Sequence, residues 1–236
     1  MTDNTRYYDA FSSTYDHGRD RGYHKLIDDQ AAAIVRRVAT GATALEVGCG
    51  TGLVMQRVAR FAAHVAGIDV SPGMLARARE RGLDVREGSA TALPFPDAAF
   101  DVVYSFKVLA HVDPVEPALA EMARVTRPGG HVVFDAYNRD SLRFLAKRAF
   151  GPRRTSSAFD EAAIGTRFDA PDEALRRARA LGTVVDVAGI RIVTAHAGIL
   201  AVPGLASVAE RAEWLLMRSP LRRFAGFLVF TVRRGA

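Results

Sequence analysis

Short apolar runs alternate with segments of helical spacing along most of this 236-residue chain. Residues 44–47 form a mostly apolar run that ends at a glycine-rich stretch, and after residue 52 the apolar positions recur every three to four residues. A strand buried in a parallel sheet is typically a short apolar run, whereas amphipathic helices show the longer period. Residues 44–58 therefore predict a strand, a glycine turn and a helix, the first crossover of an open α/β sheet.

The same alternation continues through the chain. Ser71 and Pro72 are typical of a helix start, with serine as the cap and proline as the first helical residue. We expect further strands at 65–68, 84–87, 100–105, 131–137, 183–193 and 227–232, and helices at 24–39, 74–81, 114–126, from 171 onward and at 206–217. We find no internal repeat and no linker long enough to separate two domains.

The spacing of the glycines restricts the ligand that the first turn can hold. Dinucleotide sites use G-x-G-x-x-G/A, but Gly48, Gly50 and Gly52 are two residues apart, and Leu53 stands at the third position of that fingerprint. An NAD or FAD phosphate loop is therefore disfavoured. The chain also has no G-x-x-x-x-G-K-[ST] sequence, which excludes a P-loop.

An acidic residue ends the second predicted strand. Asp69 lies 17 residues beyond Gly52, close to the interval of ~20 residues at which such folds place a carboxylate for ribose. A carboxylate there can accept hydrogen bonds from both ribose hydroxyls. Asp69 is therefore a candidate ligand of a nucleoside.

Composition excludes several other classes of protein. The single cysteine, Cys49, excludes an internal disulfide and a multi-cysteine zinc site, and we expect no metal. The net charge of +6 comes from 29 Arg and only 3 Lys spread along the chain, which favours solvated surfaces over a nucleic-acid groove. The polar N-terminus lacks the apolar region of a signal peptide, and no apolar run reaches ~18 residues. We expect a cytoplasmic protein.

Four motifs together resemble the class I S-adenosylmethionine-dependent methyltransferases: residues 45–52, 67–75, 93–97 and 127–130. The likeness is to the small-molecule group that includes ubiquinone, menaquinone and natural-product methyltransferases. It implies a Rossmann-like seven-stranded sheet of order 3-2-1-4-5-7-6, with the last strand antiparallel and helices on both faces. It also implies one domain with an N-terminal helical lid (1–40), a cofactor-binding core (41–137), a substrate-cap insertion (138–170) and the remainder of the sheet (171–236).

The resemblance further implies that S-adenosyl-L-methionine is the cofactor and S-adenosyl-L-homocysteine the product. Ser89 stands where the family usually has an aspartate that binds the adenine amino group, so we expect packing to contribute more to adenine binding here. The expected cofactor-binding residues are Tyr15, Glu46, Gly48, Cys49, Gly50, Thr51, Gly52, Asp69, Val70, Met74, Ser89, Ala90 and Phe106.

Candidate acceptor-binding residues lie at three places in the sequence. Aromatic residues at helical spacing in residues 6–16 predict a short helix, which packs on the core, forms a lid over the cofactor, or does both. His111 lies just beyond the fourth strand, where imidazole could serve as a general base or could only tie a loop to nearby backbone. The expected pocket residues are Tyr7, Phe11, Lys107, Tyr137 and Asn138.

The sequence therefore predicts methyl transfer to a small organic acceptor by a monomer or homodimer. The acceptor atom, O, N or C, stays open. No Asn/Asp-Pro-Pro-Tyr/Phe sequence is present, which argues against adenine-N6 and glutamine methylation. Two alternatives remain: a methyltransferase acting on nucleic acid or protein, and a non-catalytic S-adenosylmethionine-binding protein.

Overall fold

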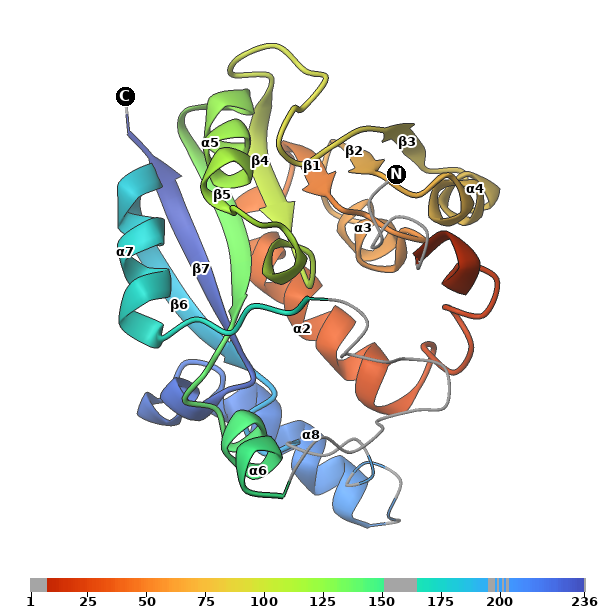
Figure 1. Ribbon diagram of the computed structural model, residues 1–236. Helices are drawn as coiled ribbons and strands as arrows, with labels where there is room; N and C mark the ends of the chain where they lie inside the picture. Colours follow the sequence, from red (N-terminus) through yellow and green to blue (C-terminus); the bar gives the residue numbers. More distant parts are fainter. Residues whose placement is uncertain are drawn as a thin grey trace.

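A computed structural model describes residues 8–150, 165–194, 198, 200, 202 and 204–235. In this part of the chain a seven-stranded sheet has the order β3-β2-β1-β4-β5-β7-β6 (Figure 1). The first five strands run parallel, and β7 is antiparallel to both of its neighbours, so the predicted topology is confirmed. The strands are β1 (Thr43–Val47), β2 (His64–Asp69), β3 (Asp84–Glu87), β4 (Phe100–Ser105), β5 (Thr126–Tyr137), β6 (Gly182–Ile190) and β7 (Phe227–Arg234).

Helices cover both faces of the sheet (Figure 1). One apolar cluster joins α2, α3 and α4 to one face, and a second joins α5 and α7 to the other. The alternation along β1 supplies both clusters, since Ala44 faces the first and Leu45 the second. The helices are α2 (Gly22–Ala39), α3 (Leu53–Val58), α4 (Pro72–Glu80), α5 (Glu116–Val125), α6 (Leu142–Phe150), α7 (Pro171–Leu181) and α8 (Leu205–Leu216), with 3-10 turns η1 (Leu109–His111) and η3 (Pro220–Phe224).

The strand register brings the functional loops to one edge of the sheet. Val47 pairs with Ile68 and Glu46 pairs with Tyr104, so β1, β2 and β4 end close together. The glycine turn follows β1, Asp69 ends β2, and the loop that contains His111 follows β4. The glycine turn, Asp69 and the loop after β4 therefore share the carboxyl edge, where open α/β sheets bind ligands.

The structure departs from the predicted elements at a few boundaries. Residues 8–11 form one helical turn and residues 12–20 a series of turns, so the predicted short helix at 6–16 is shorter. The loop after β4 contains η1, which the sequence pattern did not indicate, and β6 ends at Ile190 rather than at residue 193. Ser71 caps α4 as predicted, because its hydroxyl accepts the Met74 N–H at 3.2 Å. Within the described residues, no helix is long and apolar enough to cross a membrane.

Candidate functional site

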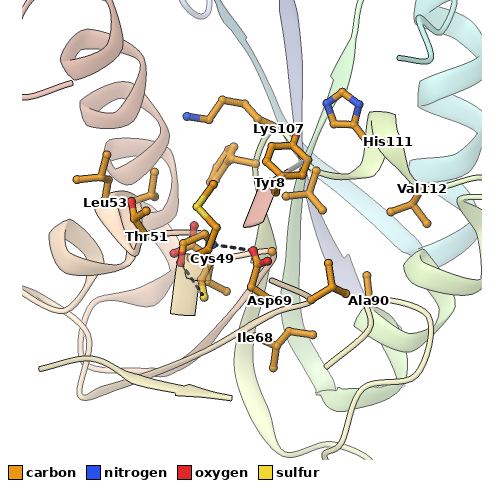
Figure 2. Close-up of a pocket in the computed structure, with 18 of the residues that line it drawn as sticks. Tyr8, Cys49, Thr51, Leu53, Ile68, Asp69, Ala90, Lys107, His111 and Val112 are labelled. Atoms are coloured by element: carbon orange, nitrogen blue, oxygen red, sulfur yellow. Dashed lines mark hydrogen bonds between the residues drawn. The ribbon is translucent and has the colours of Figure 1, made fainter. Parts of the chain in front are cut away.

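A cavity of about 730 Å³ opens at the carboxyl edge of the sheet (Figure 2). The N-terminal turns, the loops after β1, β2, β3 and β4, and one residue of α2 line it. Most residues expected from the sequence meet here, although they come from segments up to 96 positions apart (Tyr15 to His111). The expected residues that line the cavity are Tyr15, Glu46, Gly48, Cys49, Gly50, Thr51, Asp69, Val70, Met74, Ser89, Ala90, Phe106, Lys107 and His111.

The glycine turn adopts backbone conformations that only glycine enters without cost. Gly48, Gly50 and Gly52 have φ of +75°, +54° and +81°. A Cβ on Gly48 would lie 2.3 Å from a methyl group of Val108, and one on Gly52 would lie 2.2 Å from a methyl group of Leu83. Sharp turning and close packing thus both require glycine in this turn.

Asp69 ties this turn to the start of α4. Its carboxylate accepts the Gly50 N–H at 2.8 Å and the Ser71 N–H at 2.9 Å. Burial raises the pKa of this carboxyl above its ordinary value, and the backbone N–H groups of Ser71, Gly50 and Val70 oppose the rise. Because Asp69 lines the cavity while it holds the turn, one side chain fixes the shape of the wall and presents a carboxylate to a ligand.

Glu46 is a buried acid on the cavity wall. Burial raises the pKa of its carboxyl to about 8, although the Tyr104 hydroxyl, which donates to it at 3.3 Å, and the charge of Lys107 oppose the rise. The carboxyl therefore carries a proton at neutral pH until a cationic ligand group lies beside it.

Cys49 is buried behind the glycine turn. Burial, together with the neighbouring acids Glu46 and Asp69, raises the pKa of its thiol. A reactive cysteine needs a lowered pKa, so this environment argues against nucleophilic catalysis. Its sulfur instead packs where a Cβ on Gly67 would lie, 2.9 Å away.

Two aspartates of the N-terminal segment hold it over the cavity. Asp9 accepts hydrogen bonds from the Ser71 hydroxyl at 2.9 Å and from the Gly73 N–H at 2.7 Å, at the N-terminus of α4. Asp16 accepts from the Thr51 hydroxyl and from the Arg81 guanidinium, both at 2.7 Å. The segment 8–20 thus closes on the glycine turn and on α4, and it contributes lining residues to the cavity: Tyr8, Tyr15 and Arg19.

The loop after β4 brings a lysine and a histidine into the cavity, beside Tyr8 (Figure 2). The ammonium of Lys107 donates to Asp28 at 2.7 Å. The His111 ring lies with its Nδ1 3.3 Å from the carbonyl oxygen of Gly165 and with its centroid 6.4 Å from that of Tyr8. If Nδ1 donates to that carbonyl, Nε2 is the basic nitrogen of the neutral ring.

Several expected site residues are placed elsewhere. The amide of Asn138 donates to the carbonyls of Arg223 and Ala225, so Asn138 fixes a turn and does not line the cavity. Tyr137 stands behind His111 at a centroid distance of 5.9 Å, as part of an aromatic cluster. Phe11 packs edge-on against Tyr15 and does not line the cavity. Gly52 shapes the turn but does not line the cavity either. Tyr7 lies outside the described residues.

Sequence reasoning missed Asp28, Arg19 and Asp16. Asp28 is 1% exposed and lies on the inner face of α2, between apolar neighbours. The sequence did contain a signal for Asp28, since it is an acid within the apolar stripe of a predicted amphipathic helix. A buried carboxylate needs a partner, so such a position indicates an ion pair or a hydrogen bond. Arg19 and Asp16 had no such signal, since they lie in a polar run of turns.

A protein-family model matches the middle part of the chain. Residues 45–134 match the family described as a methyltransferase domain. Among curated proteins, the demethylmenaquinone methyltransferase of Renibacterium salmoninarum is 35% identical over 63% of this chain and 58% of its own. The ubiquinone biosynthesis O-methyltransferase of Hahella chejuensis is 37% identical over 51% of each chain. This chain therefore spans about half the length of the curated relatives that it matches.

Solved structures extend the likeness to the whole chain. An S-adenosylmethionine-dependent methyltransferase from Thermotoga maritima superposes with a TM-score of 0.69, at 20% identity, over 97% of this chain and 99% of its own. DhpI in complex with S-adenosylhomocysteine superposes with a TM-score of 0.60, at 25% identity, over 99% and 96% of the two chains. The fold is therefore that of the methyltransferases of this class.

We predict that Gly48→Ala destabilises the protein more than Gly50→Ala does. Alanine in the left-handed conformation costs about 1–2 kcal/mol at either position. At Gly48 the new methyl group also meets Val108, which adds roughly 1–3 kcal/mol of overpacking, whereas the space beside Gly50 is open. Urea unfolding measures both variants. Adding Val108→Ala should recover part of the loss at Gly48 only, and equal losses in the two single variants would contradict this account.

We also predict that Asp16→Ala releases the N-terminal segment. The change removes two charge-assisted hydrogen bonds and should ease local opening by about 1.4 kcal/mol or more, which is a tenfold change in population. Trypsin should then cleave after Arg19 about ten times faster under native conditions. The variant Ser13→Ala, at an exposed position in the same turns and away from the cleavage site, is the control. An unchanged rate in Asp16→Ala would show that Asp16 does not hold the segment closed.

Proposed function

Because this chain has the class I methyltransferase fold and its residues 45–134 belong to the methyltransferase domain family, we propose that it transfers the methyl group of S-adenosylmethionine to a small organic acceptor. The observation that carries the proposal is the cavity, in which the glycine turn, the carboxylate of Asp69 and the end of β4 form one continuous wall. A nucleoside and an acceptor can therefore lie side by side in one enclosed space.

The residues present fit S-adenosylmethionine from one end of the cavity to the other. Asp69 would accept hydrogen bonds from the ribose hydroxyls, and Val70 and Met74 would pack against adenine, beside the hydroxyl of Ser89. The methionine part would extend past the glycine turn toward Glu46, whose carboxyl would give up its proton beside the α-ammonium group. The cofactor supplies an activated methyl group on a cationic sulfur.

The protein's own contribution is then to place the acceptor and to remove its proton. We refer to Tyr8, Lys107 and His111 as the acceptor end of the cavity, because they lie together beyond the glycine turn (Figure 2). Holding donor and acceptor in line lowers the barrier without any further chemistry. A weakly acidic acceptor also needs a base, and His111 supplies an imidazole, the side chain whose reference pKa suits that role.

A small acceptor is favoured over a nucleic acid or a protein. The N-terminal segment covers the cavity, and Tyr8 and Tyr15 are part of its wall, so the reacting end is not an open groove. Curated relatives are named for demethylmenaquinone methylation, ubiquinone biosynthesis and malonyl-[acyl-carrier protein] O-methylation. The printed names of these relatives support an organic acceptor. A cytoplasmic location and a monomeric or homodimeric state stay predictions.

We predict that Asp69→Ala weakens the binding of S-adenosylhomocysteine by about 1.5–3 kcal/mol, roughly 10- to 150-fold, because hydrogen bonds to a carboxylate are lost. The unfolding free energy should fall as well, since Gly50 and Ser71 lose their acceptor. Calorimetry gives the affinity. Glu87, an exposed carboxylate that pairs in register with Asp69 outside the cavity, supplies the control Glu87→Ala. Unchanged affinity in Asp69→Ala would refute the ribose assignment, and NAD should not bind to either protein.

We predict that His111→Ala and His111→Gln keep the affinity for S-adenosylhomocysteine while methylation of a phenol acceptor falls ~10²–10⁴-fold, the usual contribution of a general base. Turnover is followed as release of S-adenosylhomocysteine. Glutamine retains a side chain that can donate to the Gly165 carbonyl, so it controls for loss of that contact. A small change in turnover, or a loss of stability in step with activity, would instead assign His111 to the structure of the loop.

A further inference from the structure

Lys107 is held at both of its ends. Its backbone φ is +62°, a left-handed conformation that is costly for a residue with a side chain. The backbone N–H of Lys107 donates to both carboxylate oxygens of the buried Asp135, at 2.9 and 3.1 Å. The side chain then runs along the cavity to the opposite wall, where its ammonium meets Asp28. The loop after β4 therefore fixes the position of the Lys107 ammonium in the cavity.

The ion pair keeps this lysine charged inside the fold. The Lys107 side chain is 24% exposed and the Asp28 side chain only 1%. Burial alone would lower the pKa of the lysine, but the carboxylate of Asp28 raises it above its ordinary value. Among the described residues, the second oxygen of Asp28 has no hydrogen-bond partner. Asp28 thus accepts one hydrogen bond from the ammonium, which has two further N–H groups with which to bind a ligand.

Two cations line the cavity, Arg19 and Lys107. Asp28 pairs with Lys107, while the other lining aspartates, Asp69 and Asp113, lie at the glycine turn and just beyond His111. The Glu46 carboxyl is protonated at neutral pH, since its pKa is about 8. The pKa of His24 falls to about 4, first through burial and then through Arg19 and Lys107, so this imidazole is neutral. A bound sulfonium would add a positive charge to those of Arg19 and Lys107, and an anionic acceptor oxygen would balance it.

We propose that the ammonium of Lys107 binds the ionised oxygen of the acceptor, so that the acceptor is an acidic hydroxyl compound, a phenol or an enol. This inference rests on the proposed function and adds the substrate class. The imidazole of His111 takes the hydroxyl proton. An electron pair of the oxyanion then forms the O–CH₃ bond while the S–CH₃ bond breaks, and the sulfonium becomes a neutral thioether. Lys107 stabilises the oxyanion before transfer and is not consumed.

The simpler interpretation is an ion pair that only joins α2 to the loop after β4. Such a pair would need neither the partial exposure of the Lys107 side chain to the cavity nor the strained backbone. Both interpretations predict some loss of stability when Lys107 is replaced. The distinguishing measurement is therefore the ionisation of a bound phenol, which a purely structural ion pair would not change.

The experiment uses 4-nitrophenol, which absorbs visible light only as the phenolate. The full chain is saturated with S-adenosylhomocysteine, and the absorbance of the bound phenol is titrated against pH. The wild-type protein should favour the phenolate at least tenfold over free solution. Lys107→Met should abolish that preference and keep the affinity for S-adenosylhomocysteine within twofold, whereas Lys107→Arg should retain most of it. Lys25→Met, which breaks an exposed pair with Asp29 on the same helix, is the matched control.

Each outcome decides between the interpretations. Equal ionisation in wild type and Lys107→Met, or no binding of nitrophenolate by the wild type, overturns the inference. With S-adenosylmethionine in place of the product, the bound phenolate should become 4-nitroanisole at a rate that Lys107→Met lowers at least tenfold. If nitrophenolate binds through Lys107 but is not methylated, the lysine holds a non-reacting anion. The same conclusion follows if benzoate, an anion that is not a phenolate, binds equally well in its place. A wild-type protein that fails to bind S-adenosylhomocysteine would contradict the proposed function itself.

Discussion

Two loops of this fold end with backbone N–H groups that no strand or helix can pair, and one carboxylate satisfies both. Asp69 accepts from Gly50 after β1 and from Ser71 at the start of α4. An unpaired buried N–H costs about as much as a lost hydrogen bond, so these bonds fix both loops relative to the sheet. The shape of the cavity wall is therefore a consequence of how the loops after β1 and β2 are joined through Asp69.

Burial and nearby charge together determine the protonation state of the groups around the cavity. Desolvation prevails at Glu46 and Asp135, whose pKa values rise to about 8 and about 6 although Lys107 opposes the rise at both. Lys107 shows the opposite outcome, because the carboxylate of Asp28 outweighs the cost of burying the ammonium. At neutral pH the Glu46 carboxyl is therefore protonated, whereas the Lys107 ammonium keeps its charge.

The residues that line the cavity differ in their likeness to known proteins. The family match covers residues 45–134, which supply the glycine turn, Asp69 and the loop after β4 with Lys107 and His111. Tyr8, Arg19 and Asp28 lie before this stretch, although they line the same cavity. The N-terminal segment reaches the cavity through polar contacts with the turn and with α4. The acceptor end of the proposed site therefore combines residues from inside and outside the matched stretch.

The sequence by itself determined most of the strands and helices and the glycine turn, because these depend on local periodicity and on backbone sterics that neighbouring residues specify. The strand order came from the resemblance to a known family and not from periodicity. The sequence could not place Asn138, whose amide bonds to carbonyls 85 and 87 residues away. The pairing of Lys107 with Asp28, 79 residues apart, likewise depends on how α2 packs across the sheet. Only the tertiary structure decided which polar groups meet, since a hydrogen bond requires two atoms within about 3 Å, and no spacing along the chain specifies that distance.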